Sequence, residues 1–354
     1  MKPDAVPAAS KTPSAAGFRM PAEWEPHEST WLAWPHNEET WPGPRLAEVV
    51  FIYVRMLEAL LPHEKVNLLV TGPREEEQVR ALLLKDRIGM QNLIVRHAPT
   101  ADAWIRDYGP TFVTKADQKA WCKWMFNAWG GKYAPLIGDT NVFSAKNHGF
   151  IPNPCFDAGF VLEGGSIEVN GQGTCLTTEQ CLLNKNRNPQ FSREVIEEKL
   201  RDYLGVSQVL WLEEGIAGDD TDGHIDDITR FTAPDTILSA WEEDEDDENY
   251  EILRRNWERL QNSADLKGRK WRLVKFPMPG AAADGDVRLP ASYANFYIAN
   301  NVVLLPVYGH KNDRRAADIL KELFPKRVIV SIHCNALVYG LGAIHCITQQ
   351  EPKG

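Results

Sequence analysis

Much of the 354-residue chain is built from one recurring unit: a β-hairpin, an α-helix and a further strand. The clearest copy has β-rich runs at 166–169 and 174–177, flanking the turn 170–173 (Asn-Gly-Gln-Gly), then a helix at Phe191–Tyr203 and a strand at Gln208–Leu212. Asn-Gly turns between β-rich runs are strong hairpin signals. The unit recurs roughly every 50 to 70 residues, which favours an internally repeated α/β fold over a doubly wound parallel sheet.

The same periodicity predicts elements along the rest of the chain. Further hairpins are expected at 111–126, 228–240 and 295–307, and a fifth at 337–348 that would place Cys346 in a strand. Helices are expected at Arg45–Leu61, Glu75–Leu84, Asn249–Leu260 and Asp313–Leu323, and single strands at Thr30–Ala33, Val66–Val70, Leu93–Val95, Lys270–Phe276 and Arg327–Ser331.

Three segments fall outside the repeat. Residues 1–19 are rich in Pro, Ala and Ser and are expected to be a disordered tail, which leaves 20–354 as a single domain. The acidic run 242–251 is expected to be a solvated surface segment. The long loop of small residues at 277–290 is typical of a lid or a binding loop.

Composition excludes several classes of partner. A net charge of −10 argues against nucleic acid and anionic membrane, and is compatible with a cationic substrate. No apolar run reaches the length of a membrane span. Six irregularly spaced cysteines without a CxxC pair favour free thiols in the cytoplasm, with Cys122, Cys155, Cys175 and Cys181 as buried structural thiols. The sequence leaves a homodimer open.

Unusual polar residues stand at equivalent points of the repeat, just before the hairpins. These segments are 104–110 with Asp107, 162–165 with Glu163, 223–227 with His224 and Asp226, and 292–295, while Cys346 lies within the fifth hairpin. Repeats arranged about an axis would bring the segments together in one pocket. Each residue also has a purely structural explanation: Asp107 could form a surface ion pair and Glu163 could cap a turn.

His224 and Asp226 alternate along a segment that is predicted to be extended, so they would share one face of it, with Asp227 on the other.

Two metal sites are alternatives to this pocket. The preceding acidic cluster 219–222 could be a calcium loop, although it lacks helix-loop-helix spacing. The pairs 333–334 and 345–346, both His-Cys, could ligate a metal, but nothing enforces tetrahedral closure.

A thiol, a histidine and several carboxylates in one pocket suit a cationic substrate. Carboxylates beside a thiolate would hinder acyl transfer, because they disfavour the thiolate and repel an oxyanion. A planar guanidinium, by contrast, accepts carboxylates in fork geometry. Cys346 is therefore predicted to attack a guanidinium carbon, and neighbouring carboxylates should raise its pKa in the free protein.

Five separated motifs resemble those of the agmatine deiminase and bacterial-type (Porphyromonas-type) peptidylarginine deiminase family. They are WIRDYGP (104–110), LEGGSIEVNGQGTCLTTEQCLLNKNRNP (162–189), GHIDD (223–227), ASYANFYIANN (291–301) and HCITQQEP (345–352), and the opening 20–35 is similar too. The resemblance implies a pentein fold, an α/β propeller of five pseudosymmetric ββαβ-like modules around a central pocket. It also implies guanidinium hydrolysis without metal or cofactor.

The resemblance also implies residue roles. Cys346 would be the nucleophile and His224 the general acid and base. Glu163 would hydrogen-bond the guanidinium and take part in proton transfer. Asp107 and Asp226 would bind the guanidinium nitrogens, and Trp104 would line the aliphatic arm.

The expected reaction is hydrolysis of agmatine to N-carbamoylputrescine and ammonia. Alternatives are deimination of peptidyl-arginine or another arginine derivative, and non-catalytic binding of guanidines or polyamines. Ala343 where a Gly is expected, and Asp222 and Asp227 where many relatives have Asn, leave the substrate open.

Overall fold

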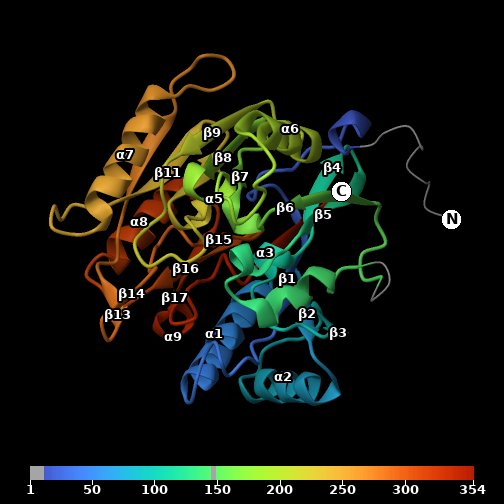
Figure 1. Cartoon of the computed structure of the whole chain (residues 1–354). Helices are drawn as coiled ribbons and strands as arrows, with labels where there is room; N and C mark the ends of the chain where they lie inside the picture. Colours follow the sequence, from blue (N-terminus) through green and yellow to red (C-terminus); the bar gives the residue numbers. More distant parts are fainter. Residues whose placement is uncertain (1–11, 145–148) are drawn as a thin grey trace.

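The computed structural model describes residues 12–144 and 149–354, and five of the sheets in these ranges share one strand pattern (Figure 1). In each, an antiparallel pair is extended by a third strand that runs parallel to the second. Four of these sheets are β4 (Thr111–Lys115), β5 (Gln118–Met125), β6 (Cys155–Val161); β7 (Glu168–Val169), β8 (Thr174–Thr178), β9 (Gln208–Leu212); β10 (Thr229–Ala233), β11 (Thr236–Trp241), β12 (Arg272–Pro277); and β15 (Tyr297–Ile298), β16 (Val302–Val307), β17 (Val328–His333). The repeat read from the sequence is therefore a repeat of sheets.

The fifth sheet joins the two ends of the chain. Strand β18 (Gln349–Pro352) pairs antiparallel with β1 (His27–Ala33), and β2 (Lys65–Val70) and β3 (Leu93–His97) continue in parallel. The hairpin predicted at 337–348 is wrong: this stretch holds α9 (Asn335–Val338) and a run of turns. The last strand finds its antiparallel partner at the start of the chain, so no local hairpin forms.

Long helices connect the parallel neighbouring strands in four of the five sheets and lie toward the outside, as α2, α6 and α7 do in Figure 1. The five long helices are α1 (Arg45–Leu60), α2 (Pro73–Lys85), α6 (Arg193–Leu204), α7 (Asn249–Asn262) and α8 (Asp313–Leu323). The predicted ranges agree with these to within two residues at each end. The short ones are α3 (Ile105–Tyr108), α4 (Ala128–Gly131), α5 (Glu179–Leu182), and the 3₁₀ turns η1 (Ser14–Ala16), η2 (Ala134–Asn141), η3 (Gly164–Ser166) and η4 (Ile225–Asp227).

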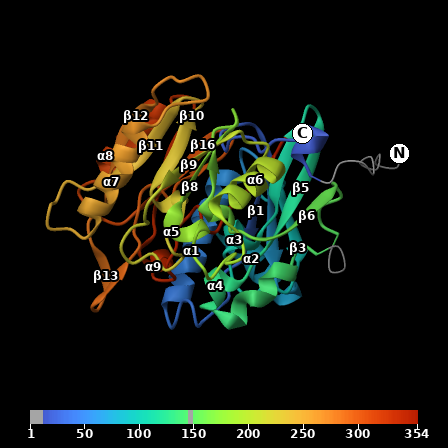
Figure 2. The ribbon, with the colours of Figure 1, turned by 45° about the horizontal axis from the view of Figure 1, so that its top comes forward.

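Burial follows the periodicity of each element. All six residues of β16 are buried, as expected for a middle strand covered on both faces. Helix α8 instead buries one stripe, with Ala316 and Leu320 in the apolar cluster that contains Phe276 and Phe296. Figure 2 shows α7, β11 and β12 toward one side of the molecule and β5 and β6 toward the other. The core is thus divided among the sheets.

The predicted disordered tail is wrong for its second half, and its first half, residues 1–11, lies outside the described residues. Phe18 is buried and packs edge-on against Phe156, with ring centroids 6.1 Å apart. Arg19 exchanges backbone hydrogen bonds with Thr114, and its Nη1 and Nη2 groups each donate to one carboxylate oxygen of Glu25. An aromatic anchor and a bidentate ion pair hold this segment on the β4–β5 sheet.

Two further predictions concern the loop at 277–290 and the cysteines. The loop forms a small hairpin, β13 (Ala282–Asp284) and β14 (Val287–Leu289), that borders the main cavity.

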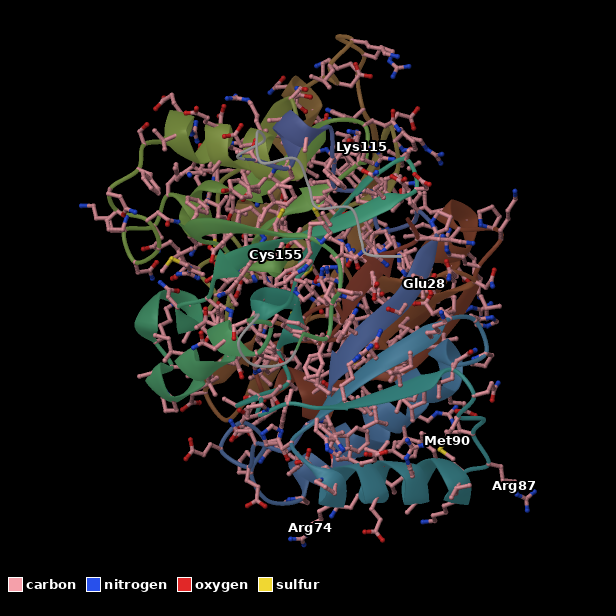
Figure 3. The ribbon with its side chains drawn as sticks, turned by 90° about the vertical axis from the view of Figure 1, so that its right-hand side faces the viewer. Glu28, Arg74, Arg87, Met90, Lys115 and Cys155 are labelled. Carbon is pink, nitrogen blue, oxygen red and sulfur yellow. The ribbon has the colours of Figure 1, made fainter. Side chains whose placement is uncertain are left out.

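All six cysteines are free thiols. Cys155, expected to be buried, is exposed at the edge strand β6 and visible on the outer face in Figure 3. Within the described residues, no helix has the length and apolar character to cross a bilayer.

Candidate active site

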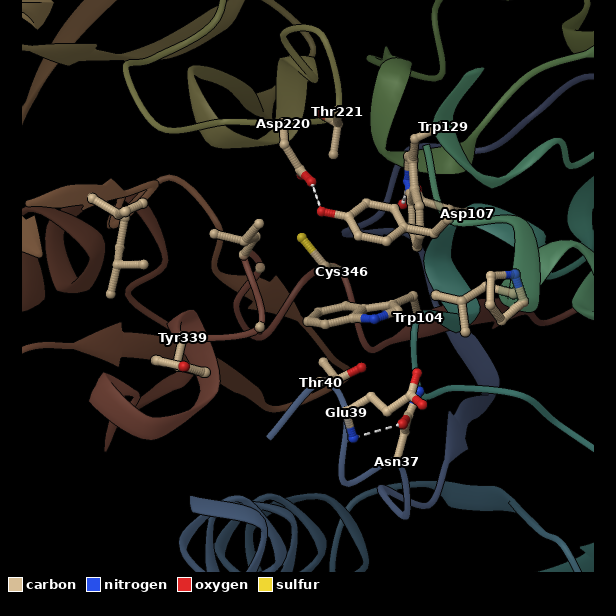
Figure 4. A pocket seen from close by; sticks show the side chains of 18 of the residues that line it. Asn37, Glu39, Thr40, Trp104, Asp107, Trp129, Asp220, Thr221, Tyr339 and Cys346 are labelled. Atoms are coloured by element: carbon tan, nitrogen blue, oxygen red, sulfur yellow. Dashed lines mark hydrogen bonds between the residues drawn. The ribbon is translucent and has the colours of Figure 1, made fainter. Parts of the chain in front are cut away.

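In each of the five equivalent sheets the first strand is preceded by a short turn, and these turns meet beneath one cavity. The cavity measures about 510 Å³, and Figure 4 shows the Cys346 sulfur between Trp104 and Asp220. Carboxylates of Glu39, Asp107, Asp220 and Asp284 line it together with several aromatic and aliphatic side chains. Among the described lining residues none is Lys or Arg, so the cavity favours a cation with an apolar portion.

Cys346 lies in the turns between α9 and β18 and is 7% exposed. A β-carbon on Gly342 would sit 2.5 Å from the Trp104 ring and 3.2 Å from the Cys346 β-carbon, so only glycine allows this close approach. Asn295 fixes the thiol: its Nδ2 donates to Sγ at 3.1 Å, and its Oδ1 accepts from the backbone N–H groups of His345 and Cys346. The thiol is thereby held in one orientation at the cavity floor.

Carboxylates crowd this sulfur. Oδ2 of Asp226 lies 3.9 Å from Sγ, and Asp227 offers an oxygen in the same cluster, within 4.8 Å of the other two groups. Burial raises the pKa of the Cys346 thiol well above its ordinary value, and the negative charges of Asp226, Asp227 and Asp107 raise it further. The sequence-based expectation of a raised thiol pKa is confirmed in direction.

Asp107 is held by α3, where Oδ1 accepts from the Gly165 N–H at 3.0 Å and Oδ2 from the Trp129 indole at 2.9 Å. Burial raises its pKa well above the ordinary carboxyl value, and the charges of Asp226 and Glu163 add to this. The pKa of Asp227 is raised in the same way, first by burial and then by the charge of Asp226. These carboxyl groups therefore lack compensating cations in the free protein.

His224 lies 3.8 Å from Asp107, measured from Nδ1 to Oδ1. A β-carbon on Gly165 would sit 2.5 Å from that Nδ1, so a bare glycine backbone lets His224, Asp107 and Asp226 converge. Burial lowers the pKa of His224 to about 3 despite the opposing charge of Asp226, so the ring is neutral at pH 7.

Glu163 is fully buried beside His224 and is paired with Arg187, whose Nε donates to Oε1 at 2.6 Å. Arg187 also binds Asp222 and the Thr221 carbonyl, which ties Glu163 to the loop that carries His224. Burial raises the pKa of Glu163, and the Arg187 charge offsets part of that rise.

Three predicted site residues carry buried polar atoms without a hydrogen-bond partner in the described structure. These atoms are Oε2 of Glu163, Nε2 of His224 and Oδ1 of Asp226. Buried polar atoms are normally paired, so their concentration in one place marks a site that meets an external polar group.

One local prediction is wrong. His224 and Asp226 were expected to alternate along an extended segment, with Asp227 facing away. Residues 225–227 instead form the 3₁₀ turn η4, which His224 precedes. A turn rotates successive side chains by about 120° rather than 180°, so both Asp226 and Asp227 reach the Cys346 cluster.

The sequence reasoning also missed several supporting residues. Asn295 stands before β15 at the position equivalent to the other site residues, so its place in the repeat was a usable signal. Trp129 adopts a left-handed backbone (φ 52°) and is followed by two glycines, which marks a specialised turn. Arg187, Glu23 and His345 gave no such signal, because their partners lie far away in the sequence.

The potential metal ligands coincide with this site. Two groups of three ligand-bearing side chains occur in the described residues: Glu163, Cys181 and His224, and Asp226, Asp227 and Cys346. The acidic cluster 219–222 forms no common centre, since Asp219 caps the backbone at 221 and 224 while Asp222 binds Lys132 and Arg187. The pair His333–Cys334 belongs to neither group.

Comparison with known proteins identifies the family. The family described as Porphyromonas-type peptidyl-arginine deiminase matches residues 19–352. The chain belongs to this family. An agmatine deiminase of Pseudomonas aeruginosa is 39% identical over 368 residues, which cover 97% of this chain and 98% of the relative.

Solved structures of the family share the fold. The chain is similar to the agmatine deiminase of Enterococcus faecalis, with a TM-score of 0.89, 37% identity and 98% of each chain covered. It is also similar to a cysteine-to-serine variant of the C. jejuni agmatine deiminase with substrate bound, at a TM-score of 0.84, 32% identity, and 95% and 97% coverage of this chain and that one. This family is enzymatic, and its mixed α/β fold is the fold described above.

Proposed function

We propose that the chain hydrolyses the guanidinium group of agmatine, giving N-carbamoylputrescine and ammonium. The observation that carries the proposal is the buried Cys346 thiol at the floor of an acidic cavity, 3.9 Å from a carboxylate whose other oxygen has no partner. A guanidinium brings both the N–H donors and the positive charge that this arrangement lacks. Relatives named agmatine deiminase over nearly the full chain support the choice of substrate.

In the proposed first half-reaction, Asp107 and Asp226 bind the guanidinium nitrogens and Cys346 attacks the central carbon. The cation lowers the cost of forming the thiolate, and His224, neutral in the free protein, accepts the thiol proton. The resulting imidazolium protonates one nitrogen of the tetrahedral carbon. The C–N bond breaks, ammonia leaves, and a thiouronium adduct remains on Cys346.

In the second half-reaction water replaces the sulfur. His224 takes a proton from water as the oxygen bonds to the carbon, and the C–S bond breaks as the carbonyl forms. The thiol regains a proton, and the remaining proton converts ammonia to ammonium. Glu163, with one oxygen fixed by Arg187 and the other unpartnered, is proposed to hold the guanidinium and to relay protons with His224.

The cavity supports agmatine over arginine. Arginine carries a carboxylate at the end of its aliphatic arm, and the described lining offers acidic groups but no Lys or Arg to receive it. Asp220 and Tyr133 line the cavity and are hydrogen-bonded to each other, and we propose that the arm passes them and packs along Trp104. An ammonium end is therefore favoured.

We further propose that the five equivalent sheets are five modules of an α/β propeller around the cavity. Asp107, Glu163, Asp226, Asn295 and Cys346 each precede the first strand of one sheet, which supports this arrangement. The free thiols support a reducing, cytoplasmic location.

Purified protein should be assayed with agmatine, arginine and a C-terminal arginyl peptide, with ammonia and the carbamoyl product both quantified. We expect equimolar products from agmatine and a kcat/KM at least about 10²-fold higher than for arginine. Cys155→Ala, which removes an exposed thiol outside the site, is the matched control and should remain active. Turnover of the peptide but not of agmatine would assign the chain to peptidyl-arginine deimination.

A further inference from the structure

We propose that His345, the residue before the nucleophile, is a permanently charged positioning residue: a buried imidazolium that links Glu23 to Asp226 and keeps one Asp226 oxygen aimed at the substrate. The inference rests on the proposed function, because it gives Asp226 its orientation toward a guanidinium. Sequence reasoning considered His345 only as a member of a potential metal-binding pair.

Both ring nitrogens of His345 face carboxylate oxygens at short distance. Nδ1 lies 2.7 Å from Oδ2 of Asp226, and Nε2 lies 2.7 Å from Oε2 of Glu23. Neutral imidazole has one N–H donor and one bare nitrogen, so a neutral ring would leave one nitrogen facing a carboxylate lone pair. Only the doubly protonated ring donates to both carboxylates, unless one of them carries a proton.

The surroundings of Glu23 favour an ionised carboxylate at that end. Its Oε1 accepts from Arg230 Nη2 at 2.9 Å and from the Ile298 N–H at 2.8 Å, and Arg106 Nη2 lies 3.6 Å from Oε2. Burial would raise the pKa of Glu23, but the charges of Arg230, His345 and Arg106 bring it below its ordinary value. Glu23 is therefore an acceptor, and His345 supplies the proton in their hydrogen bond.

Asp226 is held as an anion from the same side. Burial would raise its pKa, yet the hydrogen bond and charge of His345 lower it. The pKa values of the neighbouring Asp107 and Asp227 are raised instead. Oδ2 is occupied by the imidazole, and Oδ1 is buried without a partner. One carboxylate at the floor is thus charged before substrate arrives, with a defined free oxygen.

The backbone of His345 fixes the ring relative to the nucleophile. Its N–H donates to Oδ1 of Asn295 at 2.8 Å, and its carbonyl accepts from Arg106 Nε at 3.2 Å. Asn295 also contacts the Cys346 sulfur. A displaced imidazole would therefore change the angle between Asp226 and the attacking thiol, on which near-attack geometry depends.

The direct test is ¹⁵N NMR of the full-length protein with labelled histidine. The His345 signals are identified by their absence in His345→Gln. We expect both ring nitrogens to show the protonated shifts of imidazolium between pH 6 and pH 9, with slowly exchanging N–H protons. A neutral tautomer anywhere in that range would overturn the proposal. This measurement needs no turnover, so an enzyme inactive on every guanidine would refute the proposed function and not the charge.

A kinetic cycle tests the route through Asp226. His345→Gln should lower kcat/KM for agmatine about 10²-fold in the native background and less than about threefold in the Asp226→Asn background. A merely structural histidine would give the same loss in both backgrounds, and that result would refute the positioning role. His97→Gln is the matched control, because His97 also faces a carboxylate, Glu76, at 2.7 Å but on the exposed surface.

Discussion

Two groups of buried charges lie side by side in this molecule, and they are compensated very differently. In the first, defined by Glu23, Glu168, Arg106, Arg230 and His345, each carboxylate faces at least one cationic side chain. In the second, Asp107 and Asp227 lie near the nucleophile, and Glu163 lies beside His224. Among the described residues, Glu163 pairs with Arg187, whereas Asp107 faces the neutral His224 and Asp227 has no ion-pair partner. Asp226 belongs to both groups.

The two groups differ in what they can do. A buried charge with complete partners fixes geometry, and removing one partner leaves the other stranded at high cost. A buried carboxyl without a cation has a raised pKa and an unmet demand for positive charge, which a substrate cation can satisfy. The first group therefore acts as a frame and the second as a receptor, with Asp226 held by one and offered to the other.

The largest expected effect separates chemistry from stability. Cys346→Ala should reduce turnover of agmatine by at least about 10⁴-fold, because the covalent route is lost. Its free energy of unfolding should change by less than about 1.5 kcal/mol. Urea unfolding and ammonia release measure the two quantities. Cys334→Ala, a buried thiol outside the floor, serves as control, and comparable loss of activity there would contradict the assignment.

Removing a cation from the frame should instead lower the free energy of unfolding. Arg230→Met leaves Glu168 without an ion-pair partner among the described residues and removes one of the cationic partners of Glu23. It also removes donors to the carbonyls of Ala294 and Phe296, so the unfolding free energy should fall by about 3–5 kcal/mol. Arg201→Met removes an exposed pair with Glu197 and should cost less than about 1 kcal/mol. Equal midpoints of urea unfolding for the two variants would contradict the stabilising role given to the buried frame.

His224, which lies beside the receptor group, should make the fold sensitive to acid. Its folded pKa of about 3 lies below the unfolded value near 6.5, so between these values only the unfolded chain binds the proton. Stability therefore falls as pH drops below 6.5, by on the order of 3 kcal/mol at pH 4 from this residue. His224→Gln should lose less stability than the native chain between pH 7 and pH 4. The surface variant His97→Gln should not, and a parallel loss in all three proteins would contradict the burial of a neutral ring.

The smallest effect concerns the thiol. Asp227→Asn keeps an oxygen for Asn295 but removes a charge that raises the Cys346 pKa, so alkylation by iodoacetamide at pH 8 should become several-fold faster. Asp284→Asn, at the exposed cavity rim, should leave the rate unchanged. Slower alkylation in Asp227→Asn would show that the carboxylate does not oppose thiolate formation.

The sequence predicted what local pattern controls. Helical periodicity located α8 at Asp313–Leu323 without error. The repeat placed Asp107, Glu163, His224 and Asp226 before successive hairpins, and the structure brings these residues together with Cys346. These features depend on side-chain spacing and turn residues within short windows.

What the sequence could not show depends on contacts between distant segments. The last strand pairs with the first, so Leu337–Thr348 is free to form the turns that carry Cys346 rather than a hairpin. His345 lies between Glu23 and Asp226, which are 322 and 119 positions away, and no spacing rule relates such positions. The η4 turn also depends on tertiary context, since residues 224–226 alternate polar and apolar side chains as a strand would.

The central claim is that the receptor group captures a guanidinium for attack by Cys346. The most direct test is acid quenching of the protein during turnover of agmatine, followed by peptide mass mapping. We expect a peptide containing Cys346 to gain the mass of agmatine less ammonia, with no such gain in Cys346→Ala. Sustained turnover with an adduct on another cysteine, or with no adduct and no loss of activity in Cys346→Ala, would contradict the claim.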